Sequence, residues 1–453
     1  MHISFAQATA ACNGIYYGSQ NPEEGYFTSV TTDSRKAAKG VLFFAIKGER
    51  VDGHDFIQQV YDKGASVCIG EKEPVNDMPY IKVDSTLQAL KDLAEYYRST
   101  LTIPIIGIVG SVGITSTKEM TASILSQKYQ VLKTEGNFNN EIGLPLTIFS
   151  IQEHHEAAVV EMGISDFGEM TRLSKVAKPD TVIMTNIGQC HLENLGDRDG
   201  VLKAKSEVFT YWSKKGAIIL NGDDDKLRTL EDKLPVQYFG MDDKGAAHAE
   251  DIKDLGMEGT SCTLVFADGM RIPISISIPG QHMVYNALAG ALAGRAYGLT
   301  AEEIAKGVAA LQPVAGRNNR IQTERFTILD DCYNANPMSM CASLDVLAKS
   351  TGRKVAILGD MFELGEEENA LHAKVGSYVA KAGIDVLMCS GGLSEHMAEA
   401  AKAEGLEQVY YFHTREELQT ALPQYLQTGD SILVKASHGM QYTAIVETLQ
   451  KLL

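Results

Sequence analysis

Short continuous apolar runs recur through the middle of the chain, with helical patterns of apolar residues between them. Four such runs are IPIIGIV (103–109), AAVVEM (157–162), TVIMTNI (181–187) and GAIILN (216–221). Runs of this length are typical of strands buried on both faces, and their alternation with helices is typical of a parallel sheet. The pattern therefore predicts a mostly parallel sheet with helices on both faces. Residues from about Lys244 to Ser277 favour short strands instead, which indicates an antiparallel flap.

The chain on either side of this sheet shows the same alternation. Before it, strand-like VLFFAI (41–46) and SVCIG (66–70) precede STLQALKDLAEYYR (85–98), whose apolar residues recur at helical spacing. After it, helical segments such as SMCASLDVLAKS separate five strand candidates: FTILD (326–330), KVAIL (354–358), DVLMC (385–389), VYYF (409–412) and SILVK (431–435). This alternation predicts a doubly wound, Rossmann-like unit. No G-x-G-x-x-G motif accompanies it, so a dinucleotide cofactor is not indicated.

These patterns together predict an α/β protein of three domains. The chain has 453 residues, which exceeds a typical single core and fits about three domains. We place a small α/β domain at residues 1–98, the central parallel-sheet domain at 99–313 and the Rossmann-like domain at 314–453.

The composition narrows the class of protein without changing this division. An apolar fraction of 44% and a charged fraction of 22% are ordinary for a globular protein. The formal net charge of -17 argues against binding a nucleic-acid backbone, although a local phosphate site built from backbone N–H groups stays open. No segment has the roughly 18 uninterrupted apolar residues that a membrane span requires, and the N-terminus does not resemble a signal peptide.

The cysteines point to a reducing compartment. There are seven, an odd number, scattered along the chain and never in C-x-x-C spacing. Free thiols in the cytosol are the simplest interpretation of this pattern. We therefore predict a cytoplasmic protein. We also expect a monomer, with neither nucleic acid nor membrane as a partner.

The segment GIVGSVGITSTKEM (107–120) carries the clearest chemistry. It leaves a predicted buried strand, places Gly107, Gly110 and Gly113 three apart, and enters a helix at Thr115. Glycines let the backbone turn tightly against an anion, and the following helix offers free N–H groups to phosphate. The Thr115 hydroxyl could hold a Mg²⁺ ion that bridges the phosphates. An ordinary glycine-rich turn is the alternative interpretation.

One residue of this loop departs from the pattern of a phosphate-binding loop. Such a loop has a lysine immediately before the threonine, which neutralises the transferring phosphate. Here that residue is Ile114, which carries no charge and donates no side-chain hydrogen bond. Lys118 lies one helical turn further on, but its side chain need not point into the loop.

Three further residues support nucleotide chemistry. Glu161 ends one predicted strand, His191 follows the next, and Lys205 lies in the helical segment GVLKAKSEVF. Ligands of open parallel sheets bind beyond the carboxyl ends of the strands, where the loop, Glu161 and His191 would meet. A carboxylate and an imidazole near Mg²⁺ and phosphate suit nucleotide-dependent chemistry. Taken singly, each has a plain alternative: a surface acid, a structural histidine and a solvated lysine.

The residues at this point resemble the Mur ligase family, over essentially the whole chain. The matching motifs are TTDSRKAAKGVLFFAIKGERVDGHDF, the glycine loop, TEGNFNNEIGLPLT, VVEMG, NIGQCHLENLG, KAKSEVF, GQHMVYNALAG, AGRNNR, DDCYNANPMSM, LGDMFELGE and LVKASHGM. The NFNNEIG and YNANP pieces favour the members that add a dipeptide over those that add single amino acids or glutamate to folate.

The resemblance implies an ATP-dependent ligase that uses Mg²⁺ and acts in peptidoglycan precursor synthesis. Such an enzyme phosphorylates the terminal carboxylate of UDP-N-acetylmuramoyl-tripeptide, and the amine of D-alanyl-D-alanine then attacks the acyl phosphate. The first domain would bind the uridine nucleotide, and the central domain would bind ATP. We expect a catalytic centre of Thr115, Glu161, His191 and Lys205. All four are candidate Mg²⁺ ligands, with Lys205 acting as its carbamate.

The resemblance also assigns the binding residues. ATP would contact Gly110, Gly113, Thr115, Ser116, Asn286, His282, Arg317 and Asp331. The UDP-peptide and the dipeptide would contact Ser34, Arg35, Asn137, Asn140, Asn334 and Asn336, with Asn334 and Asn336 at the dipeptide end.

Two departures from the family pattern leave competing hypotheses. Ile114 replaces the phosphate-binding lysine, and removal of a preorganised cation typically costs roughly 10²-fold in rate. His438 stands where many relatives carry arginine. The chain could therefore be an active ligase with weakened ATP turnover, or a catalytically silent member that binds the UDP-peptide as a scaffold. A ligase with a different acceptor is a third hypothesis.

Overall fold

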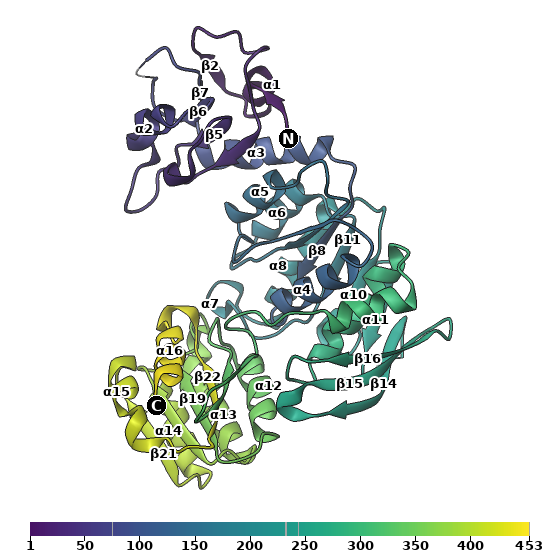
Figure 1. Cartoon of the computed structure of the whole chain (residues 1–453), viewed down its shortest axis with the longest axis vertical. Coiled ribbons are helices and arrows are strands. Elements are labelled where there is room, and N and C mark those ends of the chain that lie inside the picture. The colour runs from purple at the N-terminus through teal and green to yellow at the C-terminus, as the bar shows by residue number, and fades with distance from the viewer. Residues whose placement is uncertain (75, 232, 243, 453) are drawn as a thin grey trace.

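The computed structural model describes residues 1–74, 76–231, 233–242 and 244–452. Its sheets form three domains in a row, with the N-terminal domain at one end, the nine-stranded sheet in the middle and the C-terminal domain at the other end (Figure 1). This confirms the predicted three-domain α/β class. The residue bounds predicted for the domains stay a prediction.

The N-terminal domain is built on a five-stranded sheet. The strand order is β2 (Ile15–Tyr17), β7 (Tyr80–Lys82), β6 (Val67–Gly70), β5 (Val41–Phe44) and β4 (Ser29–Thr31), with only β2 antiparallel. A two-stranded sheet joins β1 (Ile3–Ser4) to β3 (Tyr26–Phe27). Helices α1 (Phe5–Ala11), α2 (Ile57–Asp62) and α3 (Thr86–Thr100) complete it. The strands predicted at 41–46 and 66–70 and the helix predicted at 85–98 are confirmed.

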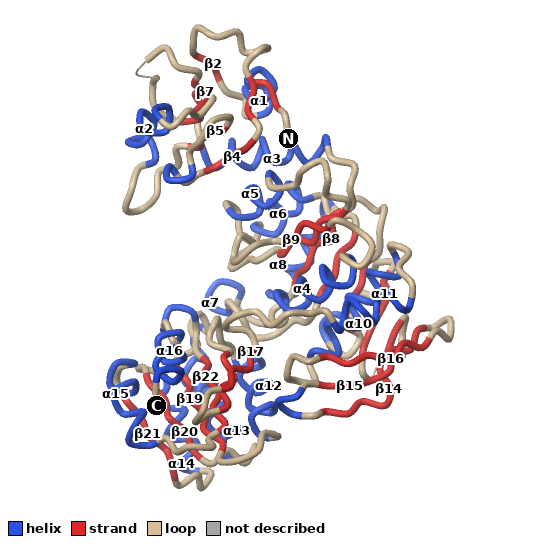
Figure 2. Tube along the Cα trace, in the orientation of Figure 1, coloured by secondary structure: helices blue, strands red, loops and turns tan. Residues whose placement is uncertain are grey.

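The central domain is one continuous nine-stranded sheet. Seven strands are parallel, in the order β9 (Val131–Lys133), β10 (Ala157–Glu161), β8 (Ile105–Val109), β11 (Thr181–Met184), β12 (Ile218–Asn221), β13 (Val236–Gly240) and β14 (Ala247–Asp254). β15 (Thr260–Phe266) pairs antiparallel with β14, and β16 (Arg271–Ile276) pairs antiparallel with β15 at the edge of the sheet. The predicted flap is therefore antiparallel, but it is the edge of the main sheet. Figure 2 shows this edge beside α10 and α11.

Helices cover both faces of the central sheet. On one face, Ile105 and Val109 share a core with α5 (Gly143–Phe149), α6 (Glu169–Ala177) and α8 (Arg198–Ser206). On the other, Ile106 and Ile108 pack against α4 (Ile114–Leu125), α10 (Met283–Ala296) and α11 (Ala301–Ala309). Successive strand residues point to opposite faces, so a strand covered on both sides must be apolar throughout. This is why the continuous apolar runs located the sheet.

The C-terminal domain has a six-stranded sheet that is parallel except at one edge. The order is β17 (Asn319–Gln322), β18 (Thr327–Asp330), β22 (Ser431–Lys435), β19 (Lys354–Gly359), β20 (Val386–Ser390) and β21 (Gln408–Phe412). Only β17 is antiparallel. The helices are α12 (Pro337–Ala348), α13 (Glu368–Lys381), α14 (Ser394–Ala403), α15 (Arg415–Tyr425) and α16 (Thr443–Lys451). All five predicted strands are present, and β17 is an addition.

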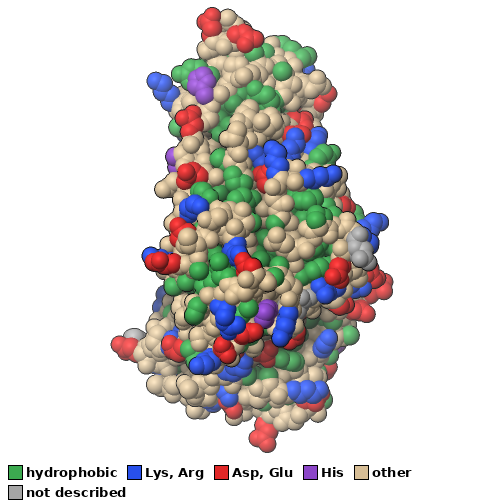
Figure 3. Space-filling view, turned by 90° about the vertical axis from the view of Figure 1, so that its right-hand side faces the viewer, with side chains coloured by type: hydrophobic (Ala, Val, Ile, Leu, Met, Phe, Trp, Pro, Cys, Tyr) green, Lys and Arg blue, Asp and Glu red, His purple; other side chains and the backbone are tan. Residues whose placement is uncertain are grey.

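The surface reflects the mixed composition. On the face shown in Figure 3, acidic and basic side chains are interspersed, with apolar side chains between them. Among the described helices, none has the length and apolar character needed to cross a membrane.

Candidate functional site

The glycine loop turns from β8 into α4 at the carboxyl edge of the central sheet. A Cβ atom on Gly110 would lie 1.9 Å from Thr185 Oγ1, so only glycine fits there. Gly113 has a φ of +79° and caps α4 in the left-handed conformation, which glycine adopts without strain. Among the described residues, no side chain caps the first turn of α4. Its N–H groups are therefore available to an anion in the loop.

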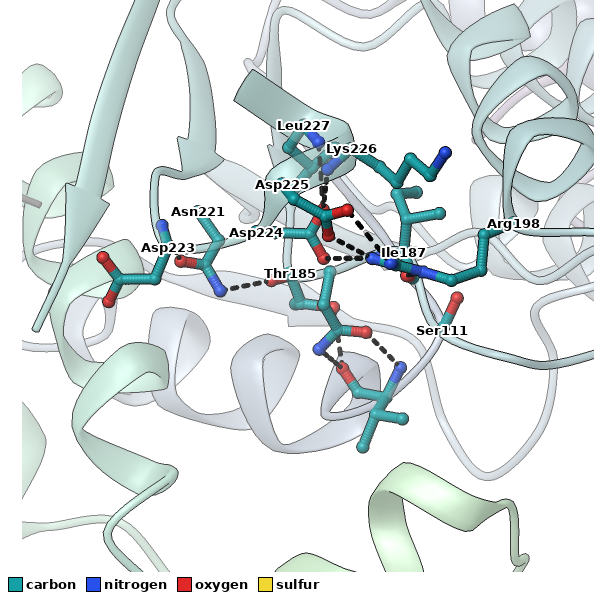
Figure 4. A network of polar contacts seen from close by, with 12 residues as sticks. Ser111, Thr185, Ile187, Arg198, Asn221, Asp223, Asp224, Asp225, Lys226 and Leu227 are labelled. Atoms are coloured by element: carbon teal, nitrogen blue, oxygen red, sulfur yellow. Dashed lines mark hydrogen bonds and ion pairs between the residues drawn. The ribbon is translucent and has the colours of Figure 1, made fainter. Parts of the chain in front are cut away.

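The loop is held in shape by the end of the neighbouring strand β11. Asn186 Oδ1 accepts a hydrogen bond from the Val112 N–H at 2.9 Å, and its Nδ2 donates to the Val112 carbonyl oxygen at 2.9 Å. Thr185 Oγ1 donates to the same carbonyl oxygen at 2.7 Å. Figure 4 shows Thr185 near Asp224, whose carboxylate caps α9 (Asp225–Arg228). Sequence analysis did not identify this clamp, because the contact between Asn186 and Val112 depends on the order of the strands in the sheet.

Glu161, at the end of β10, meets the first turn of α4. Thr115 Oγ1 donates to Glu161 Oε2 at 3.1 Å, and Asn139 Nδ2 donates to Oε1 at 2.9 Å. Glu161 is buried. A carboxylate beside a hydroxyl oxygen is a donor pair that suits Mg²⁺. Sequence analysis selected Asn137 and Asn140 of the NFNNEIG segment as substrate-binding residues and missed Asn139.

His191 reaches the site from the turn before α7 (Leu192–Leu195). It has a φ of +52°, and its Nδ1 lies 2.5 Å from Glu363 Oε2 of the C-terminal domain. The contact with His191 lowers the pKa of the Glu363 carboxyl group. Among the described residues nothing hydrogen-bonds the other ring nitrogen, Nε2. Glu363 lies within a motif that was quoted, but nothing in the sequence linked it to His191.

Lys205 is fully buried on α8. Burial lowers the pKa of its ammonium group, and no carboxylate within the described ranges forms an ion pair with it. Nearby, Cys190 Sγ donates to Ser111 Oγ of the glycine loop at 3.1 Å. The alternative of a solvated lysine is therefore wrong.

The C-terminal domain closes the site through a second cluster. Arg317 Nη2 donates to Thr115 Oγ1 at 3.1 Å. Asp331 accepts a hydrogen bond from the Asn318 N–H at 3.1 Å and pairs with Lys435 Nζ at 2.5 Å. His282 Nε2 lies 2.9 Å from Asn318 Nδ2, and burial lowers the pKa of its imidazole.

Asn286, on α10, approaches the loop from the other side. Its Oδ1 accepts a hydrogen bond from Thr117 Oγ1 at 2.9 Å and would lie 3.5 Å from a Cβ atom on Gly113. The described contacts of Asn286 are internal, as expected for an amide that supports a loop. The side chain nevertheless lines the cavity described next.

These groups surround one cavity of about 880 Å³. All three domains contribute, the N-terminal one through Leu87 and Lys91 of α3. The predicted residues that line it are Gly110, Gly113, Thr115, Ser116, Asn140, Glu161, His191, Lys205, His282, Asn286, Arg317, Asp331, Asn334 and Asn336. Ser34, Arg35 and Asn137 lie outside it. The Arg35 side chain is 86% exposed and pairs with Asp33.

The carboxylate and imidazole side chains that line this cavity would not be enough to bind a metal ion by themselves. Within the described ranges, no three His, Cys, Asp or Glu side chains form a metal-binding group. Glu161 and His191 would have to be completed by the Thr115 hydroxyl and by a modified Lys205. The residue types present match that requirement.

Sequence profiles match each domain in turn. Residues 26–98 match the Mur ligase family catalytic domain, residues 108–294 the Mur ligase middle domain, and residues 316–438 the Mur ligase glutamate ligase domain.

Proteins that match this chain over nearly its full length support the same family assignment. The chain is 36% identical over 434 residues to UDP-N-acetylmuramoyl-tripeptide–D-alanyl-D-alanine ligase of Bacillus subtilis, covering 94% of each chain. It is 34% identical to the Escherichia coli enzyme of that name, covering 99% of this chain and 98% of the relative.

Solved structures that superimpose on nearly the whole chain support the same family assignment. MurF from Acinetobacter baumannii superimposes with a TM-score of 0.91 at 32% identity, covering 100% of this chain and 99% of that one. MurF ligase from Thermotoga maritima in complex with ADP gives 0.83 at 28% identity, covering 93% and 97%. The profiles, full-length relatives and shared architecture lead to one conclusion: this chain belongs to the Mur ligase family.

Proposed function

We propose that the chain joins D-alanyl-D-alanine to UDP-N-acetylmuramoyl-tripeptide at the expense of ATP. The observation that carries this is the single cavity where the glycine loop, Glu161 and His191 meet residues of the C-terminal domain. Relatives with that name at 34–36% identity over nearly the full length support the choice of substrates.

The glycine loop is the proposed triphosphate site. Gly110 and Gly113 allow close approach of phosphate, and the first turn of α4 supplies N–H donors. Ser116 lines the same cavity, while Asn286 and His282 would contact the adenine end. A pyrophosphate bound here would meet the positive end of the α4 dipole.

Magnesium would bind through Thr115, Glu161 and His191. When bound, it would offset the negative charge of carboxylate and phosphates that approach one another. Asn139 and Thr115 already fix both oxygens of Glu161, so the carboxylate is oriented before a metal arrives. The lowered pKa of Lys205 favours its neutral amine, the form that can accept carbon dioxide to give a carbamate.

The reaction then proceeds in two displacements. The tripeptide carboxylate attacks the γ-phosphorus of ATP and ADP leaves. The dipeptide amine attacks the resulting acyl phosphate and inorganic phosphate leaves. Walls from three domains exclude the water that would hydrolyse the acyl phosphate, and they hold the reacting groups together.

Different domains would bind the two substrates. Ser34 and Arg35 are proposed to hold the uridine nucleotide, since the exposed guanidinium of Arg35 lies outside the cavity and is open to a ligand. Asn334 and Asn336 would line the dipeptide end, with Asn137 and Asn140 on the peptide side. The cytoplasm is the proposed compartment, because ATP is a cytoplasmic metabolite.

Activity measurements on this chain and on Ile114→Lys distinguish an active ligase from a catalytically silent scaffold. It begins α4 and packs against the core shared by α4 and α10, so the position itself is intact. We expect phosphate release with ATP, UDP-tripeptide and D-alanyl-D-alanine, and Ile114→Lys to raise the rate by up to roughly 10²-fold. No release from either protein would refute the ligase and favour a UDP-peptide-binding scaffold. Release with other acceptors only would change the acceptor.

A further inference from the structure

The cavity carries a second group of charges, where α3 of the N-terminal domain meets the central domain. Lys91 of α3 and Glu141 of the NFNNEIG segment both line the cavity, and Lys91 Nζ lies 2.9 Å from Glu141 Oε1. Arg172 of α6 contacts the same carboxylate, with its Nε 2.5 Å from Oε1 and its Nη2 3.0 Å from Oε2. The proposed nucleotide and metal sites use none of these three side chains.

Apolar side chains lie beside these charges. Leu87 comes one helical turn before Lys91 on α3, and Ile142 directly follows Glu141. Both line the cavity, and they are 42% and 36% exposed. Residues four apart on a helix share a face, so Leu87 and Lys91 present an apolar surface followed by a charge. Such a wall suits a ligand group with an aliphatic stem and a charged end.

One turn of the chain connects this wall to the proposed metal site. Asn139 Nδ2 donates to Oε1 of Glu161, a proposed Mg²⁺ ligand, at 2.9 Å. Asn140 Oδ1 accepts hydrogen bonds from two backbone N–H groups of the turn, at 3.2 and 2.8 Å, and so fixes its shape. Glu141 is two residues from Asn139, at most about 7 Å along the backbone. The third amino acid of the tripeptide carries the carboxylate that must reach the metal, so a long side chain on that amino acid can reach Glu141.

The charges of this wall favour one kind of side-chain end. Two cations face the Glu141 carboxylate, and the contacts with Arg172 and Lys91 lower its pKa. Glu169 also lines the cavity, but its Oε2 already accepts hydrogen bonds from two backbone N–H groups in the turn before α6. A lone ammonium group would have to compete with both cations for Glu141. A carboxylate group would instead be attracted, since the cations outnumber the anion between them.

We propose that Lys91 and Glu141 bind the end of the tripeptide's third side chain and select an amino acid that ends in both an ammonium and a carboxylate group. The ammonium binds Glu141, the carboxylate binds Lys91, and the aliphatic stem lies on Leu87 and Ile142. Arg172 holds Glu141 by two contacts, so Lys91 can turn to the ligand without leaving Glu141 uncompensated. This inference rests on the proposed ligase function and deepens it, because it names the class of tripeptide that the site takes.

Two tripeptides that differ by one carboxylate test the proposal. UDP-N-acetylmuramoyl-tripeptides ending in meso-diaminopimelate or in L-lysine share the stem and the ammonium group, and calorimetry measures their binding to the full chain without turnover. The parent should bind the diaminopimelate form roughly 10- to 100-fold more tightly, the range of a charge-assisted hydrogen bond. In Lys91→Met the ratio should fall below about threefold, because the apolar contact remains and the cation is gone. Glu141→Gln should weaken binding of both forms, since both carry the ammonium group.

Two controls separate recognition from structure. Lys381→Met removes a lysine that pairs with Glu404 at 2.8 Å outside the cavity lining, and it should keep the parent ratio. Lys91→Arg keeps the cation and should restore most of the preference that Lys91→Met loses. Urea unfolding of the same proteins should show that each variant is folded before it is titrated.

The possible results separate this inference from the proposed function. Equal binding of the two tripeptides by the parent, a preference for the lysine form, or an unchanged ratio in Lys91→Met would overturn the selective site. The ion pair would then be only a contact between two domains, and the proposed ligase would stand. Failure of the parent to bind either tripeptide would remove the peptide site, and with it both proposals.

Discussion

Gly110 shows how much of the site depends on one missing Cβ atom. Gly110→Ala would place that atom 1.9 Å from Thr185 Oγ1 and 3.3 Å from the Thr185 backbone nitrogen, so Thr185 would have to move. Overpacking of this kind costs about 1–3 kcal/mol of unfolding free energy. We expect urea denaturation to show that loss. Gly392→Ala is the matched control, since a Cβ there meets nothing within 4 Å, and equal stability of both variants would contradict the argument.

Glu363 is expected to position His191. Its carboxylate contacts Nδ1 and leaves Nε2 for a metal, the arrangement in which outer-shell carboxylates commonly support histidine ligands. Glu363→Ala should therefore weaken Mn²⁺ binding about tenfold or more, as measured by electron paramagnetic resonance in the presence of ADP. Glu366→Ala, three residues further along and outside the ion pairs of the described residues, should bind like the parent. Unchanged binding in Glu363→Ala would refute the positioning role.

For individual residues, the sequence predicted which side chains lie at the site better than it predicted which side chains they contact. Glu161, His191 and Lys205 were found because they follow strand ends or match a motif, and all three line the cavity. Asn139 was missed in favour of Asn137, since which amide of an NFNN segment faces inward depends on the turn it makes. Glu363 was missed because its contact joins two domains.

The clamp between β11 and the glycine loop gives a prediction for an element. Asn186→Ala removes two hydrogen bonds to Val112, so the loop loses the support that fixes its N–H groups. We expect affinity for Mg²⁺ and a non-hydrolysable ATP analogue to fall about tenfold, in line with the loss of one to two net hydrogen bonds. Asn194→Ala removes an exposed amide that bonds Ser165 and serves as the control. Calorimetry would contradict the clamp if both variants bound equally well.

Most strands that are buried on both faces were predictable, whereas two edge strands, β17 and β9, were not. The five strands of the C-terminal domain were found within a residue or two of their bounds, because each is a continuous apolar run. β17 (Asn319–Gln322) was missed because three of its four residues are polar and it lies at the edge of the sheet. β9 has only three residues and is the edge strand of the central sheet, next to β10. Partial exposure removes the apolar signal on which the prediction rested.

The molecule has two interfaces between neighbouring domains, here called seams, and their ion pairs differ in how deeply they are buried. Between the N-terminal and central domains, Arg98 and Asp180 form an ion pair at 2.9 Å with side chains only 9% and 11% exposed. Between the C-terminal and central domains, Lys349 pairs with Asp254, and the lysine side chain is 46% exposed. Buried charges depend on their partners far more than exposed ones.

This difference can be measured by breaking each seam in turn. Arg98→Met leaves Asp180 buried without its cation and should cost about 3–5 kcal/mol of unfolding free energy. Lys349→Met should cost at most about 1 kcal/mol. Urea denaturation of the two variants compares them directly, and similar losses would contradict the distinction between the seams.

Ile114 also has a consequence for inhibitor selectivity. Its apolar side chain forms part of the wall against which phosphates are proposed to bind, next to the stacked Arg317 and Tyr333. A compound that places a small alkyl or aryl group against this wall would gain apolar contact here. In an enzyme with lysine at that position, the same group would have to strip water from an ammonium ion. Such a compound would discriminate between this chain and an enzyme with lysine at that position.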